Sequence, residues 1–307
     1  MSYLRGMEVR AKKSLGQHFL TDQDIARRIV DSLQGSPVLE VGPGMGVLTK
    51  YLIPQLAGQA LEPGRVHSRF AAAEYGLSSK PAPATEAFES QDNDLATGLA
   101  ASTCQLKAIE IDKESVAYLK KHFPELGDGL IEGDFLKMDL QGLFPGQFSI
   151  IGNFPYNISS QIFFKIIDNR DLVPEVVCMI QKEVAERIAE KPGTKTYGIL
   201  SVFLQAWYDI EYLFTVGSGA FNPPPKVQSA VIRLTRNSRT ELGCDEKLFK
   251  AVVKTAFGQR RKTLRNSLKP LLQKAGRLSE PGESVFDLRP ERLSVEDFID
   301  LTLRLTP

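Results

Sequence analysis

A glycine-rich turn near the N-terminus constrains the fold of this chain more than any other feature. The apolar run 38–41 leads directly into Gly42-Pro43-Gly44-Met45-Gly46, and the residues that follow are typical of a helix start. Glycine lets backbone N–H groups approach a ligand closely and adopts positive φ without a Cβ penalty. Val47 stands where the dinucleotide fingerprint has its third glycine, which argues against a nicotinamide dinucleotide. The pattern therefore predicts a strand–loop–helix unit for a cofactor without a pyrophosphate; a tight turn without any ligand is the alternative.

Acidic residues accompany three of the expected strands. Glu40 lies two residues before Gly42 of the glycine loop, where it can neutralise a cation, and S-adenosylmethionine, a sulfonium with an amino-acid tail, fits such a site. Glu110 ends a second apolar run, the place where a carboxylate accepts hydrogen bonds from ribose hydroxyls, whereas we expect Asp112 to be solvated or to cap a helix. Asp134 can accept a hydrogen bond from the amine of a cofactor adenine while Phe135 packs near its ring. Glu110 or Asp134 alone is more often a helix cap, but their order together with the glycine loop and the N-F-P-Y segment favours a cofactor site.

The tetrapeptide Asn153-Phe154-Pro155-Tyr156 follows the apolar run 148–151. The side-chain oxygen of Asn153 and the carbonyl of Phe154 can both accept hydrogen bonds from one exocyclic amine. Pro155 stiffens the turn, and the ring of Tyr156 offers a flat face for stacking. The motif predicts a pocket for a planar base that is held by its amino group.

The basic residues are distributed unevenly along a chain whose formal net charge is only +1. Ten Lys or Arg residues and no Asp or Glu occur between Lys247 and Arg277. Such a run suits a face that binds phosphates and contributes affinity without sequence information. An ordinary solvated helix face is the alternative.

Alternating strand and helix patterns predict an α/β fold with a mostly parallel sheet that is covered on both faces. We expect helices at 22–33, 159–167 and 183–189, and strands at 37–41, 106–111, 129–132, 148–152, 175–181, 205–216 and 227–235, the last two antiparallel. After Arg239 only helical patterns remain. We therefore expect a Rossmann-like domain over 1–238 and a small all-helical domain over 239–307.

The segment 57–105 does not fit this alternation. It is rich in Ala, Ser, Glu, Pro and Gly, and it stands where a short connection would suffice. Loops of this length without secondary structure are uncommon in compact domains. We expect a flexible, solvent-facing insertion of unknown role.

Cysteine usage and the N-terminus bear on the compartment. Cys104, Cys178 and Cys244 are scattered and form no C-x-x-C pair, which indicates a reducing compartment and no metal site. The basic N-terminus lacks the apolar core of a signal peptide, and no membrane span is visible. We expect a cytoplasmic monomer without a metal.

In seven segments the chain resembles the ribosomal RNA adenine N6,N6-dimethyltransferases that modify small-subunit RNA. These segments occur in the order of the family and reach from the N-terminal arm to the C-terminal helices. They are Ser14–Leu20 (S-L-G-Q-H-F-L), Glu40–Gly46 (E-V-G-P-G-M-G), Glu110–Asp112 (E-I-D), Gly133–Phe135 (G-D-F), Asn153–Tyr156 (N-F-P-Y), Phe221–Ser229 (F-N-P-P-P-K-V-Q-S) and Ala256–Asn266 (A-F-G-Q-R-R-K-T-L-R-N). Two positions depart from the family pattern: His18 stands where Asn is more common, and Phe154 where Leu or Ile is.

The resemblance implies a Rossmann-like methyltransferase with a helical RNA-binding domain, which uses S-adenosyl-L-methionine. The implied substrate is a pair of adjacent adenosines in a loop near the 3′ end of 16S rRNA, modified to N6,N6-dimethyladenosine during biogenesis of the small ribosomal subunit. The implied base site is Asn153, Phe154, Pro155 and Tyr156, with Phe221 on the opposite face of the base. The implied cofactor residues are Gln17, His18, Leu20, Glu40, Gly42, Gly44, Glu110, Asp134, Phe135 and Asn153. The implied RNA-binding residues, on a basic helix, are Arg260, Arg261, Lys262 and Arg265.

Three other functions stay open at this point. The first is a large-subunit rRNA adenine methyltransferase of the macrolide-resistance type, which shares the motifs but matches the basic C-terminal segment less well. The second is a ribosome assembly factor whose binding matters more than its catalysis, although the intact motifs favour an active enzyme. The third is a DNA adenine methyltransferase, which N-x-P-Y chemistry alone permits.

Overall fold

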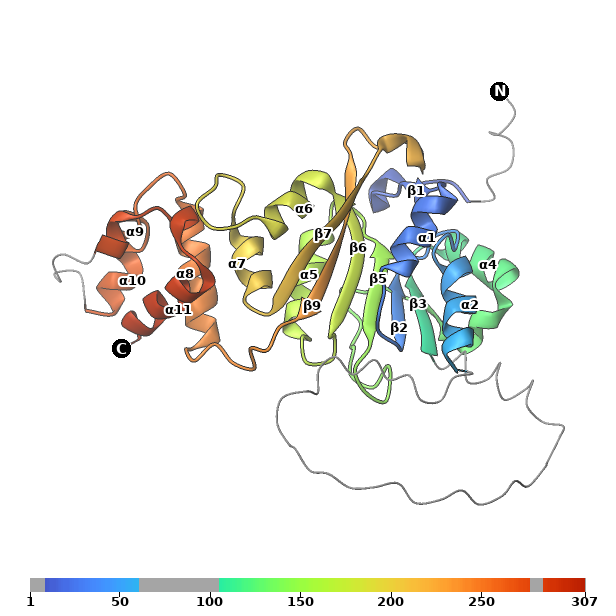
Figure 1. The fold of residues 1–307 in the computed structure, drawn as a ribbon, viewed down its shortest axis with the longest axis horizontal. Coiled ribbons are helices and arrows are strands. Elements are labelled where there is room, and N and C mark those ends of the chain that lie inside the picture. Colours follow the sequence, from blue (N-terminus) through green and yellow to red (C-terminus); the bar gives the residue numbers. More distant parts are fainter. Residues whose placement is uncertain (1–8, 61–104, 277–283, 307) are drawn as a thin grey trace, which may run out of the picture.

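The computed structural model describes residues 9–60, 105–276 and 284–306. Parallel strands occupy one end of the molecule, and the C-terminal helices gather at the other end, beyond α6 and α7 (Figure 1). No helix in these described ranges is long and apolar enough to cross a bilayer. The same ranges contain no group of three His, Cys, Asp or Glu side chains placed to hold a metal ion.

A seven-stranded sheet with the order β4-β3-β2-β5-β6-β9-β7 forms the centre of the described structure. Its first five members in this order pair in parallel, and β9 pairs antiparallel with both β6 and β7. The strands are β2 (Val38–Val41), β3 (Leu106–Glu110), β4 (Leu130–Glu132), β5 (Ser149–Asn153), β6 (Glu175–Gln181), β7 (Tyr208–Val216) and β9 (Ser229–Arg236). The expected strands and the antiparallel closing pair are confirmed, apart from small shifts at their ends.

Ten α-helices accompany the sheet in the described residues. They are α1 (Gln23–Asp31), α2 (Thr49–Ala60), α4 (Lys113–His122), α5 (Ser159–Asp168), α6 (Lys182–Ala189), α7 (Ile199–Gln205), α8 (Glu246–Gly258), α9 (Leu264–Ser267), α10 (Lys269–Lys274) and α11 (Val295–Arg304). The side chain of Asp22 caps α1 by accepting hydrogen bonds from the backbone N–H groups of Asp24 and Ile25. The expected helices at 22–33, 159–167 and 183–189 are thus confirmed.

The parallel strands alternate their side chains between two separate apolar cores, as the period of a strand requires. In β6, Val177 and Met179 face the core beneath α1 and α2, whereas Val176, Cys178 and Ile180 face the core beneath α5 and α7. Both faces of the sheet are therefore buried, as parallel sheets require.

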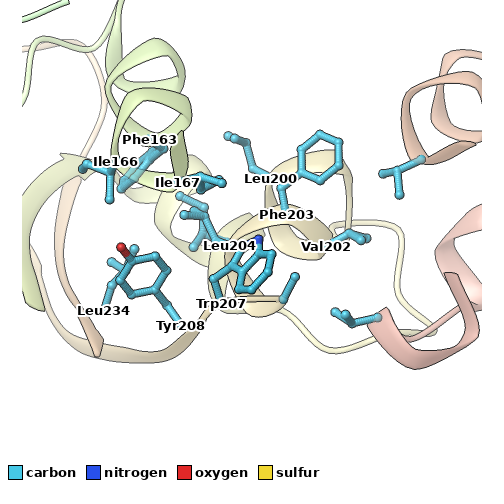
Figure 2. Packing of buried hydrophobic residues seen from close by; sticks show 14 of the residues in the cluster. Phe163, Ile166, Ile167, Leu200, Val202, Phe203, Leu204, Trp207, Tyr208 and Leu234 are labelled. Carbon is cyan, nitrogen blue, oxygen red and sulfur yellow. The ribbon is translucent and has the colours of Figure 1, made fainter. Parts of the chain in front are cut away.

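Helix α7 was not expected. Its apolar residues lie on every side of the helix, because it is packed between α5, α6 and the C-terminal helices. Figure 2 shows Leu200, Phe203 and Leu204 of α7 beside Ile167 of α5. A short, continuously apolar run carries no helical period by which it could be distinguished from a strand.

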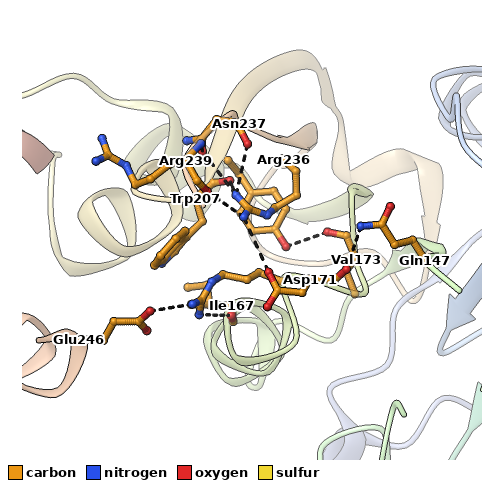
Figure 3. A network of polar contacts seen from close by, with 11 residues as sticks. Gln147, Ile167, Asp171, Val173, Trp207, Arg236, Asn237, Arg239 and Glu246 are labelled. Atoms are coloured by element: carbon orange, nitrogen blue, oxygen red, sulfur yellow. Dashed lines mark hydrogen bonds and ion pairs between the residues drawn. The ribbon is translucent and has the colours of Figure 1, made fainter. Parts of the chain in front are cut away.

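The C-terminal helices share their apolar core with the sheet domain. Phe249 and Val252 of α8 and Phe298 of α11 belong to the same cluster as Phe163 and Phe203. Polar contacts reinforce this junction: Arg170 lies 3.8 Å above the Trp207 ring and donates to Glu246 of α8 at 2.7 Å (Figure 3). The expected boundary near residue 239 marks a change in secondary structure without a break in the core.

The insertion expected at 57–105 lies almost entirely outside the described residues. Its first residues belong to α2, which runs to Ala60, and β3 begins at Leu106. Because α2 connects two adjacent parallel strands, the C-terminal end of α2 and the N-terminal end of β3 lie at the same edge of the sheet (Figure 1).

Replacing residues 61–104 by about six Gly and Ser residues should leave the fold intact, because a short connection spans this edge. Loop-closure entropy changes slowly with length, so we expect the free energy of unfolding to change by no more than about 1–2 kcal/mol. Urea unfolding followed by circular dichroism measures this change. A matched deletion of 53–104 also removes the buried Leu56 of α2 and should be clearly less stable. Equal destabilisation by both deletions would contradict the prediction.

Candidate active site

A cavity of about 260 Å³ opens at the carboxyl ends of β2, β3 and β5, where ligands bind in open α/β sheets. The parallel pairing of these three strands brings the glycine loop, the Glu110 segment and the N-F-P-Y motif to one edge. The expected site residues that line the cavity are Gln17, His18, Leu20, Glu40, Gly42, Gly44, Glu110, Asp134, Phe135, Asn153, Phe154, Pro155 and Tyr156.

The glycine loop approaches the cavity with its backbone. Gly42 has φ +70° and donates its N–H to the carbonyl of Ile109 at 2.9 Å. A Cβ on Gly42 would meet no atom within 4 Å, so a ligand can reach the backbone there. Gly46 also has positive φ (+74°), and a Cβ on it would lie 2.3 Å from the Phe123 ring. The loop therefore requires glycine at position 42 for its backbone conformation, and at position 46 for both backbone conformation and packing.

Glu110 connects the glycine loop to the start of α4. Its Oε2 accepts the N–H of Gly44 at 2.9 Å, and its Oε1 accepts the N–H of Asp112 at 2.8 Å. Burial raises the pKa of Glu110, although these two hydrogen bonds partly oppose the rise. Each carboxylate oxygen has a second lone pair, so the side chain can also accept hydrogen bonds from a ligand in the cavity.

Glu40 lies deeper than the sequence suggested. Its side chain is only 1% exposed, and its Oε2 accepts the Thr49 hydroxyl at 2.6 Å. Burial raises the pKa of Glu40 to about 7. A bound cation would favour the ionised carboxylate, so the position still suits the neutralising role that we expected.

Asp112 holds the N-terminal segment against the cavity. As expected it caps α4, but its side chain is buried, accepting Lys12 Nζ at 2.5 Å and Gln17 Nε2 at 3.4 Å. Burial alone would raise the pKa of Asp112, but the hydrogen bonds from Lys12 and Gln17 hold it below its ordinary value. Gln17, an expected cofactor residue, also accepts the backbone N–H of Lys12 at 2.8 Å. Its side chain therefore positions the segment that covers the cavity.

The loop after β4 presents Asp134 and Phe135 to the cavity. Asp134 accepts the N–H of Leu136 at 3.0 Å, and Lys165 of α5 donates to the carbonyls of Leu136, at 3.1 Å, and Met138. The same ammonium lies 5.7 Å from the centre of the Phe135 ring. Lys165 was missed in the sequence because a lysine inside an amphipathic helix carries no distinguishing signal.

The side chain of Asn153 has a fixed orientation at the end of β5. Its Nδ2 donates to the carbonyl of His18 at 3.0 Å, which leaves Oδ1 as an acceptor. The backbone N–H of Phe154 donates to Met179 at 3.0 Å, and the buried Phe154 ring contacts Phe163 edge-on at 6.0 Å. Both residues expected to hold an amine are therefore held in place by neighbouring strands and helices.

Tyr156 is anchored at its hydroxyl, which lies 2.5 Å from the Ser229 hydroxyl of β9. Burial raises the pKa of Tyr156. The His18 ring stacks on the Tyr156 ring with a centroid distance of 5.6 Å and an interplanar angle of 29°. The side chain of His18 thus lies beside the expected base site.

The structure does not bring Phe221 to the cavity. Phe221 belongs to the short strand β8 (Phe221–Asn222), which pairs antiparallel with β1 (Phe19–Leu20) opposite Leu20. Its side chain is 4% exposed and packs in the core beneath α1 and α2. Phe221 is not among the residues that line the cavity, so a role for its ring as the second stacking face stays a prediction.

The expected basic helix is a turn between two helices. Helix α8 ends at Gly258, and α9 begins at Leu264. Within the turn Arg260 approaches Glu291 at 3.9 Å, whereas Arg261 and Lys262 are exposed.

Arg265, on α9, donates to Asp287 at 3.2 Å. Half of the expected RNA-binding set therefore pairs with acids from a more distant part of the chain, which a count of charges along the run did not reveal.

Ile111 and Asn157 also line the cavity, and neither was expected there. Ile111 is 50% exposed although it follows a buried strand. An apolar residue between the two acids of E-I-D was the only available signal for this position. Asn157 directly follows the N-F-P-Y motif, and its Oδ1 would lie 2.6 Å from a Cβ on Gly16.

Comparison with known proteins places this chain in a family. The family model described as ribosomal RNA adenine dimethylase matches residues 8–60 and 94–300. The chain is 53% identical over 298 residues to the ribosomal RNA small subunit methyltransferase A of Parabacteroides distasonis, covering 96% of this chain and 94% of that one. It is also 53% identical over 306 residues to the protein of the same name from Porphyromonas gingivalis ATCC 33277, covering 97% and 99%.

Solved structures share the fold. A dimethyladenosine transferase from Plasmodium falciparum superposes with a TM-score of 0.62 at 23% identity, covering 94% of this chain and 96% of that one. The 23S rRNA methyltransferase ErmE superposes with a TM-score of 0.54 at 22% identity, covering 94% and 99%. Both confirm the expected Rossmann-like methyltransferase fold.

The raised pKa of Glu40 predicts a pH-dependent stability. The folded protein retains the Glu40 proton up to about pH 7, whereas the unfolded chain loses it near 4.5, so stability falls as pH rises between these values. The amide in Glu40→Gln has no such proton to lose. We therefore expect the difference in free energy of unfolding, variant minus parent, to be about 2–4 kcal/mol larger at pH 8 than at pH 4.5. Urea unfolding at both pH values measures this difference, with the exposed Glu125→Gln as a control for loss of a carboxylate. A difference between parent and variant that does not change with pH would contradict the prediction.

Proposed function

Because the chain belongs to the ribosomal RNA adenine dimethylase family, we propose that it dimethylates the N6 amines of two adjacent adenosines. The proposed substrate is the loop near the 3′ end of 16S rRNA, within the small ribosomal subunit. One observation carries this proposal: Asn153, its amide nitrogen fixed on the His18 carbonyl, lies in the same cavity as the glycine loop. An amine acceptor and a cofactor loop in one cavity are what methyl transfer to a base requires.

S-adenosyl-L-methionine supplies, when bound, an activated methyl group on a sulfonium. The residues present fit this cofactor: the open space at Gly42 admits a ligand to the backbone, and Glu110 has acceptors for ribose hydroxyls. Asp134 and Phe135 would hold the adenine, in a loop that Lys165 fixes from behind. Glu40 would neutralise the positive charge from beneath the glycine loop.

The protein's contribution at the base site is alignment and charge placement. The N6 amine of adenine is a poor nucleophile because its lone pair is delocalised into the ring. Hydrogen bonds from this amine to Asn153 Oδ1 and to the Phe154 carbonyl favour a tetrahedral nitrogen and stabilise the positive charge that develops there. Tyr156 stacks on the base, which must leave its helical stack to enter the cavity. No strongly basic side chain is required, and the motif contains none.

The basic turn supplies phosphate contacts in this proposal. Arg261 and Lys262 are exposed and can approach RNA, whereas Arg260 and Arg265 hold the turn in place through Glu291 and Asp287. We assign RNA binding to the helical part of the chain after residue 239 and methyl transfer to residues 1–238. We place the reaction in the cytoplasm and expect a monomer.

The alternatives are weaker. The small-subunit enzymes named above are 53% identical to this chain, whereas the large-subunit enzyme ErmE is 22% identical and supports the fold alone. A purely structural assembly factor has no need of an oriented Asn153 or an open glycine loop, although an assembly role can coexist with catalysis. The family match also disfavours a DNA substrate.

Asn153→Ala should lower methyl transfer to small subunits by more than about tenfold, because a principal alignment contact contributes more than ~1.4 kcal/mol to the barrier. Asn153→Asp retains an acceptor oxygen but loses the donor to His18, so it should fall between the parent and Asn153→Ala. Tritium transfer at saturating cofactor measures the rate, and binding of small subunits should persist in both variants. Transfer by Asn153→Ala within threefold of the parent would remove Asn153 from the assigned role.

Reversing the exposed pair, Arg261→Glu with Lys262→Glu, should weaken binding to small subunits and reduce the slope of log affinity against log salt by about one to two. Cofactor affinity should not change, because neither residue lines the cavity. Filter binding between 50 and 200 mM salt measures the slope. The matched control is Lys120→Glu on α4, also an exposed lysine. An unchanged slope in the double variant would show that the turn is only a solvated surface.

A further inference from the structure

The imidazole of His18 has a fixed orientation that the proposed chemistry does not explain. Its Nδ1 lies 2.9 Å from the carbonyl of Pro223, in the loop that follows β8. Its plane is tilted by 29° from the plane of Tyr156, with ring centroids 5.6 Å apart. The backbone carbonyl of the same residue orients Asn153. The side chain is therefore immobilised at one edge and presents its ring beside the base site.

The ring is only partly buried and lines the cavity together with Tyr156 and Asn157. Phe221, the other aromatic residue expected near the base, is packed into the core instead. His18 and Tyr156 thus form a pair of stacked rings at the wall of the cavity in which the target base is proposed to bind.

We propose that His18 forms a stacking site for the nucleotide next to the target adenosine. This inference rests on the proposed function, because it concerns the same cavity and the same RNA. The ligand is the base of a flanking nucleotide, and the contact is between ring faces, so purines should bind more strongly than uracil.

The physical reason is the loss of stacking when a base leaves an RNA loop. Extrusion of the target adenosine exposes one face of its neighbour, which raises the free energy of the open conformation. Aromatic side chains recover this loss in proteins that bind single strands. An imidazole held at a carbonyl can do so at little entropic cost, because its orientation is already set.

Three substitutions separate stacking from hydrogen bonding. His18→Ala removes both the ring and the donor, His18→Asn keeps a donor for the Pro223 carbonyl, and His18→Phe keeps a ring alone. We expect His18→Ala and His18→Asn to lower kcat/KM for unmodified small ribosomal subunits by about tenfold, and His18→Phe to restore most of the rate lost in His18→Ala. Affinity for S-adenosylhomocysteine, measured by calorimetry, should stay within twofold of the parent. A loss of this affinity in His18→Ala as large as the loss in kcat/KM would assign His18 to the cofactor role that the resemblance implied and would overturn the proposal.

The control is a second histidine with similar geometry. His122 on α4 stacks on Tyr118 at 4.0 Å and 20°, its Nδ1 lies 2.9 Å from a backbone carbonyl, and no residue of α4 lines the cavity. His122→Ala should therefore methylate small subunits at the parent rate.

The identity of the ligand is tested with small subunits in which either of the two adjacent adenosines is replaced by uridine. For the parent, a uridine neighbour should lower methylation of the remaining adenosine about as much as His18→Ala does. The variant should be insensitive to the same replacement, since the contact is already lost. If the losses caused by His18→Ala and by the uridine replacement are additive in both substituted small subunits, the proposal is overturned. It is also overturned if His18→Asn, and not His18→Phe, restores the rate lost in His18→Ala. Absence of dimethylation by the parent on unmodified small subunits would instead refute the proposed function.

Discussion

Both oxygens of the Glu110 carboxylate accept backbone N–H groups, one from Gly44 on the loop after β2 and one from Asp112 at the start of α4. The hydrogen bond from Gly44 joins the carboxyl ends of the adjacent parallel strands β2 and β3, and the one from Asp112 holds the turn between β3 and α4. The glycine loop takes positive φ at Gly42 and Gly44, a conformation that needs support from its neighbours. Because Glu110 is buried, its charge is stabilised mainly by the amides that it positions, so the loop and the carboxylate depend on each other.

The N-terminal segment connects the side of the cavity near Asp112 with the side near Asn153. Lys12 and Gln17 contact Asp112, two residues after Glu110, and the carbonyl of His18 orients Asn153. Gly16 lies between these contacts, with φ +63° and no room for a side chain beside Asn157. One short segment therefore touches both halves of the cavity. A ligand that orders the segment at one end is expected to affect the geometry at the other end.

Much of the fold and of the site could be predicted from the sequence, because its signals are local. Each signal stands at the end of a strand: the glycine loop after β2, the acids at the ends of β3 and β4, and the N-F-P-Y turn at the end of β5. Parallel pairing brings the ends of these strands together. What could not be predicted depends on contacts between distant segments. The core position of Phe221 follows from the β1–β8 pairing, and the pairing of Arg265 with Asp287 joins residues that a local count of charges treats as separate. Helix α7 was missed because residues 200–204 are all buried, which leaves the helix without a polar face.

The shared core between the sheet domain and the C-terminal helices gives the basic turn a defined position. Phe249 and Phe298 pack into the cluster that contains Phe163 of α5, and α5 itself begins three residues after Tyr156. Arg170, at the other end of α5, contacts Trp207 and Glu246 across the same junction. Phosphate contacts alone carry no sequence information. In the proposed function, phosphate contacts held at a fixed distance from the cavity would determine which part of a folded RNA reaches Asn153, so the shared core at this junction would contribute to substrate choice.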